Sequence, residues 1–159
     1  MTPLYIFDID GTLTNAEHRV PYLANSKDIY RWDKFNSACA LDTAHTHTIA
    51  TLELLKRAGA DILFFTGRYE TYRETTITWL AKHTSYIPDD FDSETYIELL
   101  TMRPVNCRIQ DSILKEIWLN KLSAYDRARL AAVFEDRASV VEMWRRNKVT
   151  CFQVAKGDF

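Results

Sequence analysis

Short, continuously apolar runs alternate along the chain with segments whose apolar residues recur every three or four positions. A continuous run is typical of a strand that is buried on both faces, and the wider spacing is typical of a helix with one buried face. The runs predict strands at residues 4–7, 61–68, 129–137 and 149–154, with a further short strand within 96–102. The spacing predicts helices at residues 26–39, 45–58, 70–83, 110–122 and 138–146.

This alternation predicts an α/β fold, a Rossmann-like parallel sheet with helices on both faces and right-handed crossovers. In such sheets, ligands bind at the carboxyl ends of the strands. Polar residues follow three of the apolar runs, namely Asp8 and Asp10, Thr66 to Arg68, and Glu135 and Asp136. These groups converge if the three strands are neighbours.

Residues 1–159 are expected to form one domain, because a chain of this length supports a single sizeable core. The segment 14–43 has no place in the predicted sheet, and we expect it to form a small insert near the site. Neither this segment nor the irregular stretch 84–108 is long enough for a large cap, so the site should be open.

Composition describes an ordinary globular protein, with 47% apolar and 26% charged residues. No apolar run is long enough to cross a membrane, and the first residues lack the basic and apolar regions of a secretory signal. The three cysteines form no CxxC pair, which argues against a disulfide framework. We therefore expect a cytoplasmic protein, in the host cell if a phage encodes it.

Charge is unevenly distributed along the chain, although the net charge is only −2. From Arg103 onward there are 11 Lys or Arg against 7 Asp or Glu. A solvated surface is the favoured interpretation of this asymmetry. A basic rim beside a phosphate site and a basic face for a partner protein are the alternatives.

Asp8 and Asp10 follow a buried strand, and their carboxylates repel each other. Their position so close together therefore needs an explanation. A calcium loop starting at Asp8 would need Gly at its sixth position and Glu at its twelfth, but Gly11 is fourth and Arg19 is twelfth. A simple Asp-Gly turn does not account for Asp8 at the mouth of the strand. A divalent cation does, because it relieves the repulsion, and Asp136 could supply a further oxygen ligand.

Mg²⁺ takes only one or two carboxylates in phosphate sites, which leaves one aspartate free for chemistry. A carboxylate can attack phosphorus, and a second one can protonate the departing oxygen and later activate water. Phosphoryl transfer also needs donors, and the Thr66 hydroxyl, the Gly67 backbone N–H and the Lys115 ammonium are candidates. Asp111 precedes Lys115 by four positions and could orient it on the same helix face.

In this order, "DIDGT", "FFTGR", a helix lysine and an acidic pair resemble the haloacid-dehalogenase-like (HAD) phosphohydrolases. The C-terminal "EDRASVVEMWRRNKVTCFQVAKGDF", with "YRETTITWL" and "MR" at 102–103, is similar to the 3′-phosphatase domains of bacteriophage polynucleotide kinase/phosphatases. The chain has no GxxxxGK[ST] phosphate loop, so only the phosphatase half has a counterpart here.

The resemblance implies a role for each matching residue. Asp8 would be the nucleophile, and Asp10 the general acid/base whose backbone carbonyl also binds Mg²⁺. Asp136 would be the remaining metal ligand, Thr66 would hold the phosphate and Lys115 would neutralise it. The implied substrate contacts are Arg19 and Arg68, and the implied support for the lysine is Asp111.

Two positions depart from the family pattern. Glu135 stands where the family usually has aspartate, and we expect it to act through water or from behind the metal ligands. Asn147 and Lys148 stand where a glycine usually precedes the last strand. Asparagine tolerates the left-handed conformation, so the turn should survive.

The sequence favours a Mg²⁺-dependent phosphomonoesterase whose substrate is a 3′-phosphate on a nucleic-acid end. A phosphatase for free nucleotides is the main alternative, since the chain is mildly acidic and lacks a kinase half. A non-catalytic phosphate or nucleotide binder is a further one, although binding alone would not need both aspartates. Trp32 and Tyr22 in the insert could stack on a base, but core packing is the favoured interpretation.

Overall fold

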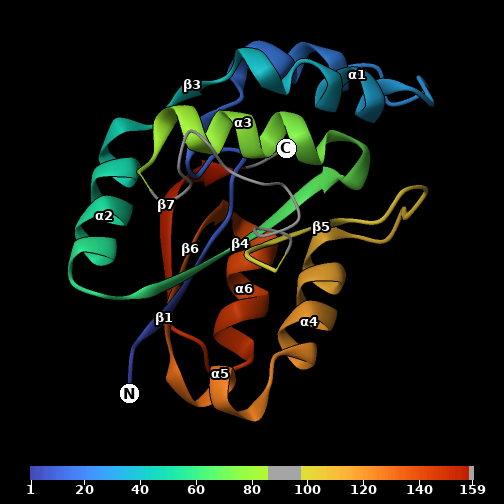
Figure 1. Ribbon diagram of the computed structural model, residues 1–159. Coiled ribbons are helices and arrows are strands. Elements are labelled where there is room, and N and C mark those ends of the chain that lie inside the picture. Colours follow the sequence, from blue (N-terminus) through green and yellow to red (C-terminus); the bar gives the residue numbers. More distant parts are fainter. Residues whose placement is uncertain (86–97, 158–159) are drawn as a thin grey trace.

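Five parallel strands form the central sheet of the computed structural model, which describes residues 1–85 and 98–157 (Figure 1). Their spatial order is β5–β4–β1–β6–β7, and every neighbouring pair is parallel. The strands are β1 (Leu4–Phe7), β4 (Asp61–Tyr69), β5 (Leu100–Arg103), β6 (Leu130–Arg137) and β7 (Cys151–Gly157). This sheet confirms the predicted α/β class. Residues 96 and 97 of the predicted fifth strand lie outside the described residues.

Helices cover both faces of the sheet, because successive strand residues point to opposite sides. Phe7 and Phe64 pack in one core cluster with α2 and α3, and the neighbouring Ile6 and Phe65 pack in the other with α4 and α6. The four helices are α2 (Thr46–Arg57), α3 (Arg73–His83), α4 (Asp111–Lys121) and α6 (Ala138–Arg146). A short 3₁₀ turn, η3 (Glu70–Tyr72), leads into α3, and α5 (Ala124–Arg129) precedes β6.

Helix α4 turns a different face to the core than the apolar spacing alone predicts. The helical spacing of Ile113 and Ile117 predicts that both face inward, but they are 48% and 40% exposed. Lys115 is instead buried beside Leu114, with only 2% of its surface accessible. Its ammonium pairs with carboxylates at the end of the sheet, and Leu114, Trp118 and Leu119 of the same helix pack in the core.

The segment between β1 and α2 contributes no strand to the central sheet. Figure 1 shows it above the upper ends of the strands. It holds η1 (Glu17–Leu23), α1 (Arg31–Ser37) and η2 (Cys39–Leu41), and β2 (Thr14–Asn15) pairs antiparallel with β3 (Thr43–Ala44). The helix expected from residue 26 begins only at Arg31. The side chains of Asn25 and Asp28 accept hydrogen bonds from the backbone two residues on, which favours turns before the helix.

The turn before β7 is left-handed at Lys148 (φ 60°) and not at Asn147 as expected.

The strand order matters more for function. β1 lies between β4 and β6, so the three polar groups that follow these strands meet at one edge of the sheet. Across the described ranges, the structure contains no helix with the length and apolar character needed to span a membrane.

Candidate active site

The turn after β1 places the two aspartates of the first motif in different surroundings. Three successive backbone N–H groups, from Thr12 to Thr14, donate to the carbonyl of Ile9 at 2.9 to 3.2 Å. Gly11 adopts a left-handed φ of 84°, which glycine reaches without a steric penalty. The backbone N–H of Asp8 donates to Phe134 on β6, so Asp8 stays close to the sheet while the chain turns away behind it.

Three buried carboxylates converge beside the end of β1. Asp8, Glu135 and Asp136 are 5%, 1% and 2% exposed, and each offers an oxygen within 4.8 Å of the others. The ammonium of Lys115 donates to Asp8 Oδ1 at 2.5 Å and to Glu135 Oε2 at 2.7 Å. One lysine therefore faces three carboxylates in a region with little water.

The pKa values of these groups reflect the crowding of negative charge. Burial and the charge of Glu135 raise the pKa of Asp8 to about 8, against the attraction of Lys115. Burial and the charge of Asp8 raise the pKa of Asp136 to about 6. Burial alone would lower the pKa of Lys115, but Asp8 and Glu135 raise it, so this side chain stays cationic. Clustered carboxylate oxygens are the donor set that Mg²⁺ takes, and the site fits such an ion.

Two glycines leave room for the Asp136 carboxylate. A Cβ atom on Gly11 would lie 2.3 Å from Asp136 Oδ2, and one on Gly157 would lie 2.2 Å from the same oxygen. Neither distance is compatible with a side chain. Gly157, at the end of β7, is a site residue that the sequence analysis did not identify.

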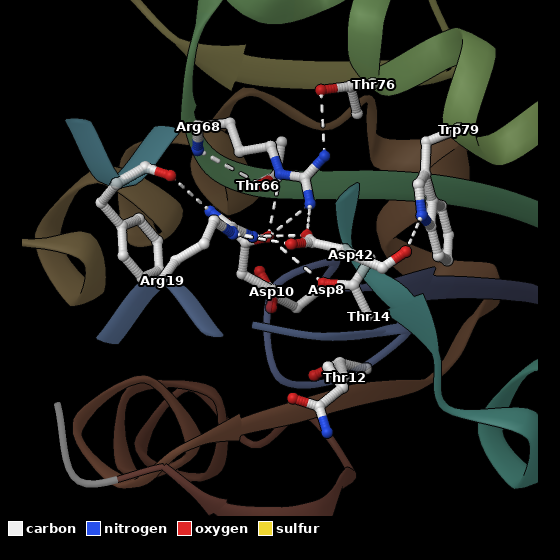
Figure 2. A network of polar contacts seen from close by, with 12 residues as sticks. Asp8, Asp10, Thr12, Thr14, Arg19, Asp42, Thr66, Arg68, Thr76 and Trp79 are labelled. Atoms are coloured by element: carbon white, nitrogen blue, oxygen red, sulfur yellow. Dashed lines mark hydrogen bonds and ion pairs between the residues drawn. The ribbon is translucent and has the colours of Figure 1, made fainter. Parts of the chain in front are cut away.

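Asp10 lies among cations (Figure 2). Its Oδ1 accepts hydrogen bonds from Arg19 Nη2 at 2.6 Å and from Arg68 Nε and Nη2 at 2.9 and 2.5 Å. Burial alone would raise the pKa of Asp10, but the charges of Arg68 and Arg19 outweigh it and hold this pKa well below its usual value. The two aspartates of the motif thus have their pKa values shifted in opposite directions.

Arg19 and Arg68, the expected substrate contacts, bind other carboxylates of the protein in this structure. Arg19 and Arg68 are both 0% exposed, and their guanidinium groups bind Asp10 and Asp42. Asp42 is also fully buried and was not identified from the sequence. The stretch "CALDTA" gives only a weak signal for it, an isolated acid among small and apolar residues.

Asp111 also has different partners from those expected. Its two oxygens accept hydrogen bonds from Arg103 and Arg137, while the ammonium of Lys115 turns to Asp8 and Glu135. Asp111 therefore acts on Lys115 through charge at longer range and not through the direct contact that the helix spacing suggested. Its direct effect is to hold Arg103 and Arg137 at the site.

The remaining predicted residues lie where β4 and β6 end. Thr66 is fully buried, and its hydroxyl accepts a hydrogen bond from the backbone N–H of Arg68 at 3.3 Å. Gly67 lines the pocket in front of Asp8, and its carbonyl accepts from Arg103 Nε. Glu135 Oε1 accepts from the backbone N–H groups of Asp136 and Arg137, while Oε2 accepts from Lys115. Both oxygens of Glu135 thus have protein partners.

A pocket of about 670 Å³ opens in front of these residues. Asp8, Asp10 and Lys115 line it together with the half-buried Trp32 of α1. The exposed Arg108 lines it as well. Asp8 and Asp10 therefore face a space large enough for a nucleotide-sized group.

Comparisons with known proteins agree with this geometry. The family model for the polynucleotide kinase PNKP phosphatase domain matches residues 2–159. A putative bifunctional polynucleotide kinase/RNA ligase of Autographa californica nuclear polyhedrosis virus is 30% identical over 153 residues. That match covers 94% of this chain but 19% of the viral protein.

Several solved structures are also similar to this chain. A chain in the structure of the Pnkp1/Rnl/Hen1 RNA repair complex is 33% identical, with a TM-score of 0.71 over 99% of this chain and 44% of that one. The class C acid phosphatase of Bacillus anthracis is 18% identical, with a TM-score of 0.58 over 87% of this chain and 53% of its own. CbbY of Rhodobacter sphaeroides, solved with phosphate, is 14% identical, with a TM-score of 0.62 over 100% of this chain and 88% of its own. The last two show a shared fold alone, and the chain spans less than half of the repair-complex chain.

Proposed function

Because the chain belongs to the family of PNKP phosphatase domains and is a HAD-type phosphatase, we propose that it removes 3′-phosphates from nucleic-acid ends. We further propose that Asp8 forms an aspartyl-phosphate and that the reaction depends on Mg²⁺. The observation that carries the proposal is the pair of aspartates with opposite electrostatic surroundings that line one pocket. Residues 1–159 would then form one phosphatase domain.

In the proposed reaction, a carboxylate oxygen of Asp8 attacks phosphorus and the bond from phosphorus to the leaving oxygen breaks. Asp10 gives its proton to the departing oxygen, so that the product leaves as an alcohol. In the second step Asp10 takes a proton from water, which attacks the aspartyl-phosphate and releases inorganic phosphate and free Asp8. Lys115 lies within hydrogen-bond distance of Asp8 and would stabilise charge on the transferred group.

The low pKa of Asp10 suits its role as a base in the second step. For the first step, the proton that Asp10 delivers would arrive with the substrate. Phosphate monoesters lose their second proton at a pKa near 6, so near neutral pH a fraction of them still carries it. Transfer of that proton to Asp10 and then to the leaving oxygen keeps the step balanced.

The cation would be held by Asp8, Asp136 and the backbone carbonyl of Asp10, with Glu135 supporting Lys115 from behind. When bound, Mg²⁺ would keep the carboxylates ionised and neutralise charge on the transferred phosphoryl group. Thr66 and Gly67 would supply neutral donors to the phosphate. Arg137, which lines the pocket and binds Asp111, would contribute positive charge.

Several features support a nucleic-acid end as the substrate. The viral relative is named as a polynucleotide kinase/RNA ligase, and the related solved chain belongs to an RNA repair complex. In this chain the pocket lining includes the half-buried Trp32 and the exposed Arg108, an aromatic surface and a charge that suit a base and a backbone phosphate. A free nucleotide remains the competing substrate, because the same pocket would accept one.

The proposal is tested by a phosphate-release panel in Mg²⁺. It compares 3′-phosphorylated DNA and RNA oligonucleotides with 3′- and 5′-mononucleotides over a range of salt concentrations. We expect the oligonucleotides to be preferred and their advantage to fall steeply with salt, since several phosphate contacts release counterions. Inert oligonucleotides beside a 5′-mononucleotide that turns over would identify a nucleotide phosphatase instead.

Asp8→Asn separates an enzyme from a binder. The variant should lose turnover of every phosphate ester while it still binds the product oligonucleotide. Asp126→Asn is a matched control, because Asp126 pairs with Arg129 on α5, far from the carboxyl ends of the strands (Figure 1). Unchanged turnover in Asp8→Asn would rule out Asp8 as the nucleophile.

A further inference from the structure

We propose that Asp42 is a positioning residue for the general acid, and that with Arg19 and Arg68 it holds Asp10 so that Oδ2 faces the leaving oxygen. The inference rests on the proposed function, since it assigns Asp10 the proton transfer. Figure 2 shows the arrangement, with both arginine side chains directed at Asp10 and Asp42.

All the hydrogen bonds that the described residues make to the Asp10 side chain end on Oδ1. Besides the bonds from Arg19 and Arg68, this oxygen accepts one from the hydroxyl of Thr14 at 3.4 Å. Guanidinium groups donate but never accept a proton, so Oδ1 stays an acceptor and a proton carried by Asp10 must sit on Oδ2. The Asp10 side chain is 16% exposed and lines the pocket, whereas both arginines are fully covered.

Asp42 fixes the two arginines in turn. Arg19 forms a fork with it, Nε to Oδ1 at 2.7 Å and Nη2 to Oδ2 at 2.5 Å, and Arg68 Nη2 reaches Oδ2 at 2.7 Å. The backbone carbonyl of Asp42 accepts a hydrogen bond from Trp79 Nε1 at 2.8 Å. This contact anchors Asp42 to α3, on one face of the sheet.

The charges show why Asp42 is needed. Arg19 and Arg68 donate to the same oxygen of Asp10, so two buried cations lie side by side. With Asp42 the group of four is neutral. Without it, Asp10 would be the only carboxylate in direct contact with both guanidinium groups, and a buried charge without compensation is costly. The carboxylate of Asp10 would then be drawn towards the arginines and away from the leaving oxygen.

A misplaced acid harms some substrates much more than others. A nucleoside 3′-oxygen is a poor leaving group and needs a proton, whereas 4-nitrophenolate departs without one. Because kcat/KM reports the steps up to the first bond cleavage, the ratio of kcat/KM for 4-nitrophenyl phosphate over a 3′-phosphorylated oligonucleotide measures acid catalysis. Partial unfolding lowers kcat/KM for both substrates by the same factor, so it leaves their ratio unchanged.

The experiment measures this ratio for the wild type, Asp10→Asn, Asp42→Asn and Val140→Ala. Asp10→Asn should raise it by about 100-fold, the lower part of the range for general acid catalysis. Asp42→Asn should raise it by about tenfold, because the acid is present but misplaced. Val140→Ala disturbs the core beneath α6, away from the network, and should leave the ratio unchanged.

The outcomes separate the two levels of the argument. If Asp10→Asn does not change the ratio, the assignment of Asp10 as the acid is wrong. If Asp10→Asn raises it and Asp42→Asn lowers both activities equally, Asp42 is merely structural and our inference is overturned. Should Asp42→Asn fail to fold, Trp79→Phe removes the hydrogen bond that anchors Asp42, together with some core packing that affects both substrates equally, and it must raise the ratio about threefold for the inference to stand.

Discussion

Replacing Asp136 by asparagine should make the protein more stable without Mg²⁺ and much less responsive to Mg²⁺ when it is added. Asp136 is one of three buried carboxylates within 4.8 Å of one another, and a single lysine binds two of them. Asparagine keeps the shape, and its carbonyl can still accept the hydrogen bond that the Thr12 hydroxyl gives to Oδ1. The substitution therefore removes charge and little else.

The size of the effect follows from the spacing. When both carboxylates are ionised, two unit charges 4.8 Å apart repel by about 3.5 kcal/mol at an effective dielectric constant of about 20, and partial protonation lowers this value. Lys115 and Arg137 attract Asp136 and offset part of this repulsion, so the net gain should be about 1–3 kcal/mol. For a domain of this size, that corresponds to a rise of roughly 3–10 °C in Tm.

Mg²⁺ should stabilise the wild type much more than Asp136→Asn. At a concentration of about 100 times its Kd, a ligand of the folded state alone adds about 2.7 kcal/mol, or roughly 5–10 °C in the wild type. Asp136→Asn should show less than a third of that shift. Thermal melts in EDTA and in MgCl₂ measure both effects, with Asp126→Asn as a control that behaves like the wild type. A lower melting temperature for Asp136→Asn in EDTA, or an unresponsive wild type, would refute the argument.

Three further predictions concern individual residues. Gly157→Ala would bring a Cβ atom to 2.2 Å from Asp136 Oδ2, so the Mg²⁺ concentration for half of the thermal shift should rise about tenfold. Trp32→Ala should raise KM for the oligonucleotide by about 5–150-fold, the value of one base–aromatic stack, and leave KM for 4-nitrophenyl phosphate nearly unchanged. For Asp111, burial would raise the pKa, but Arg137 and its other cationic neighbours lower it below the usual 3.8. The ionised Asp111 side chain stabilises the folded protein above pH 3.8, and this stabilisation is lost as the pH falls through the lower pKa that Asp111 has in the folded state. In urea unfolding, Asp111→Asn should therefore lose less stability than the wild type as the pH falls below about 4.

Parts of the site could be predicted because they depend on local pattern. A strand buried on both faces must be continuously apolar, and the acids that end it must lie at the sheet edge. This logic placed Asp8, Glu135 and Asp136 together before the strand order was known, and the neighbouring positions of β1 and β6 confirm it. Their catalytic and metal-binding roles remain proposals.

Other parts depend on contacts between distant segments, which leave little trace in the sequence. The side chain of Lys115 is buried and not exposed to solvent. Its ammonium binds Asp8 and Glu135, which are 107 and 20 positions away in the sequence. Without those partners, Ile113 and Ile117 look like the better core residues. Asp42 belongs to no motif. The family resemblance implied substrate contacts for its partners Arg19 and Arg68, and the sequence around them does not reveal a buried counter-ion.

The two aspartates that end β1 have pKa values shifted in opposite directions, yet only one residue separates them. Local chemistry cannot make that difference, since both follow the same strand. It comes from opposite sides of the site. Glu135 and burial act on Asp8 from the C-terminal half, while Arg19 and Arg68 act on Asp10 from the N-terminal half. The segment that adds no strand to the central sheet supplies Arg19 and Asp42, so it contributes charge to the site as well as the pocket-lining Trp32.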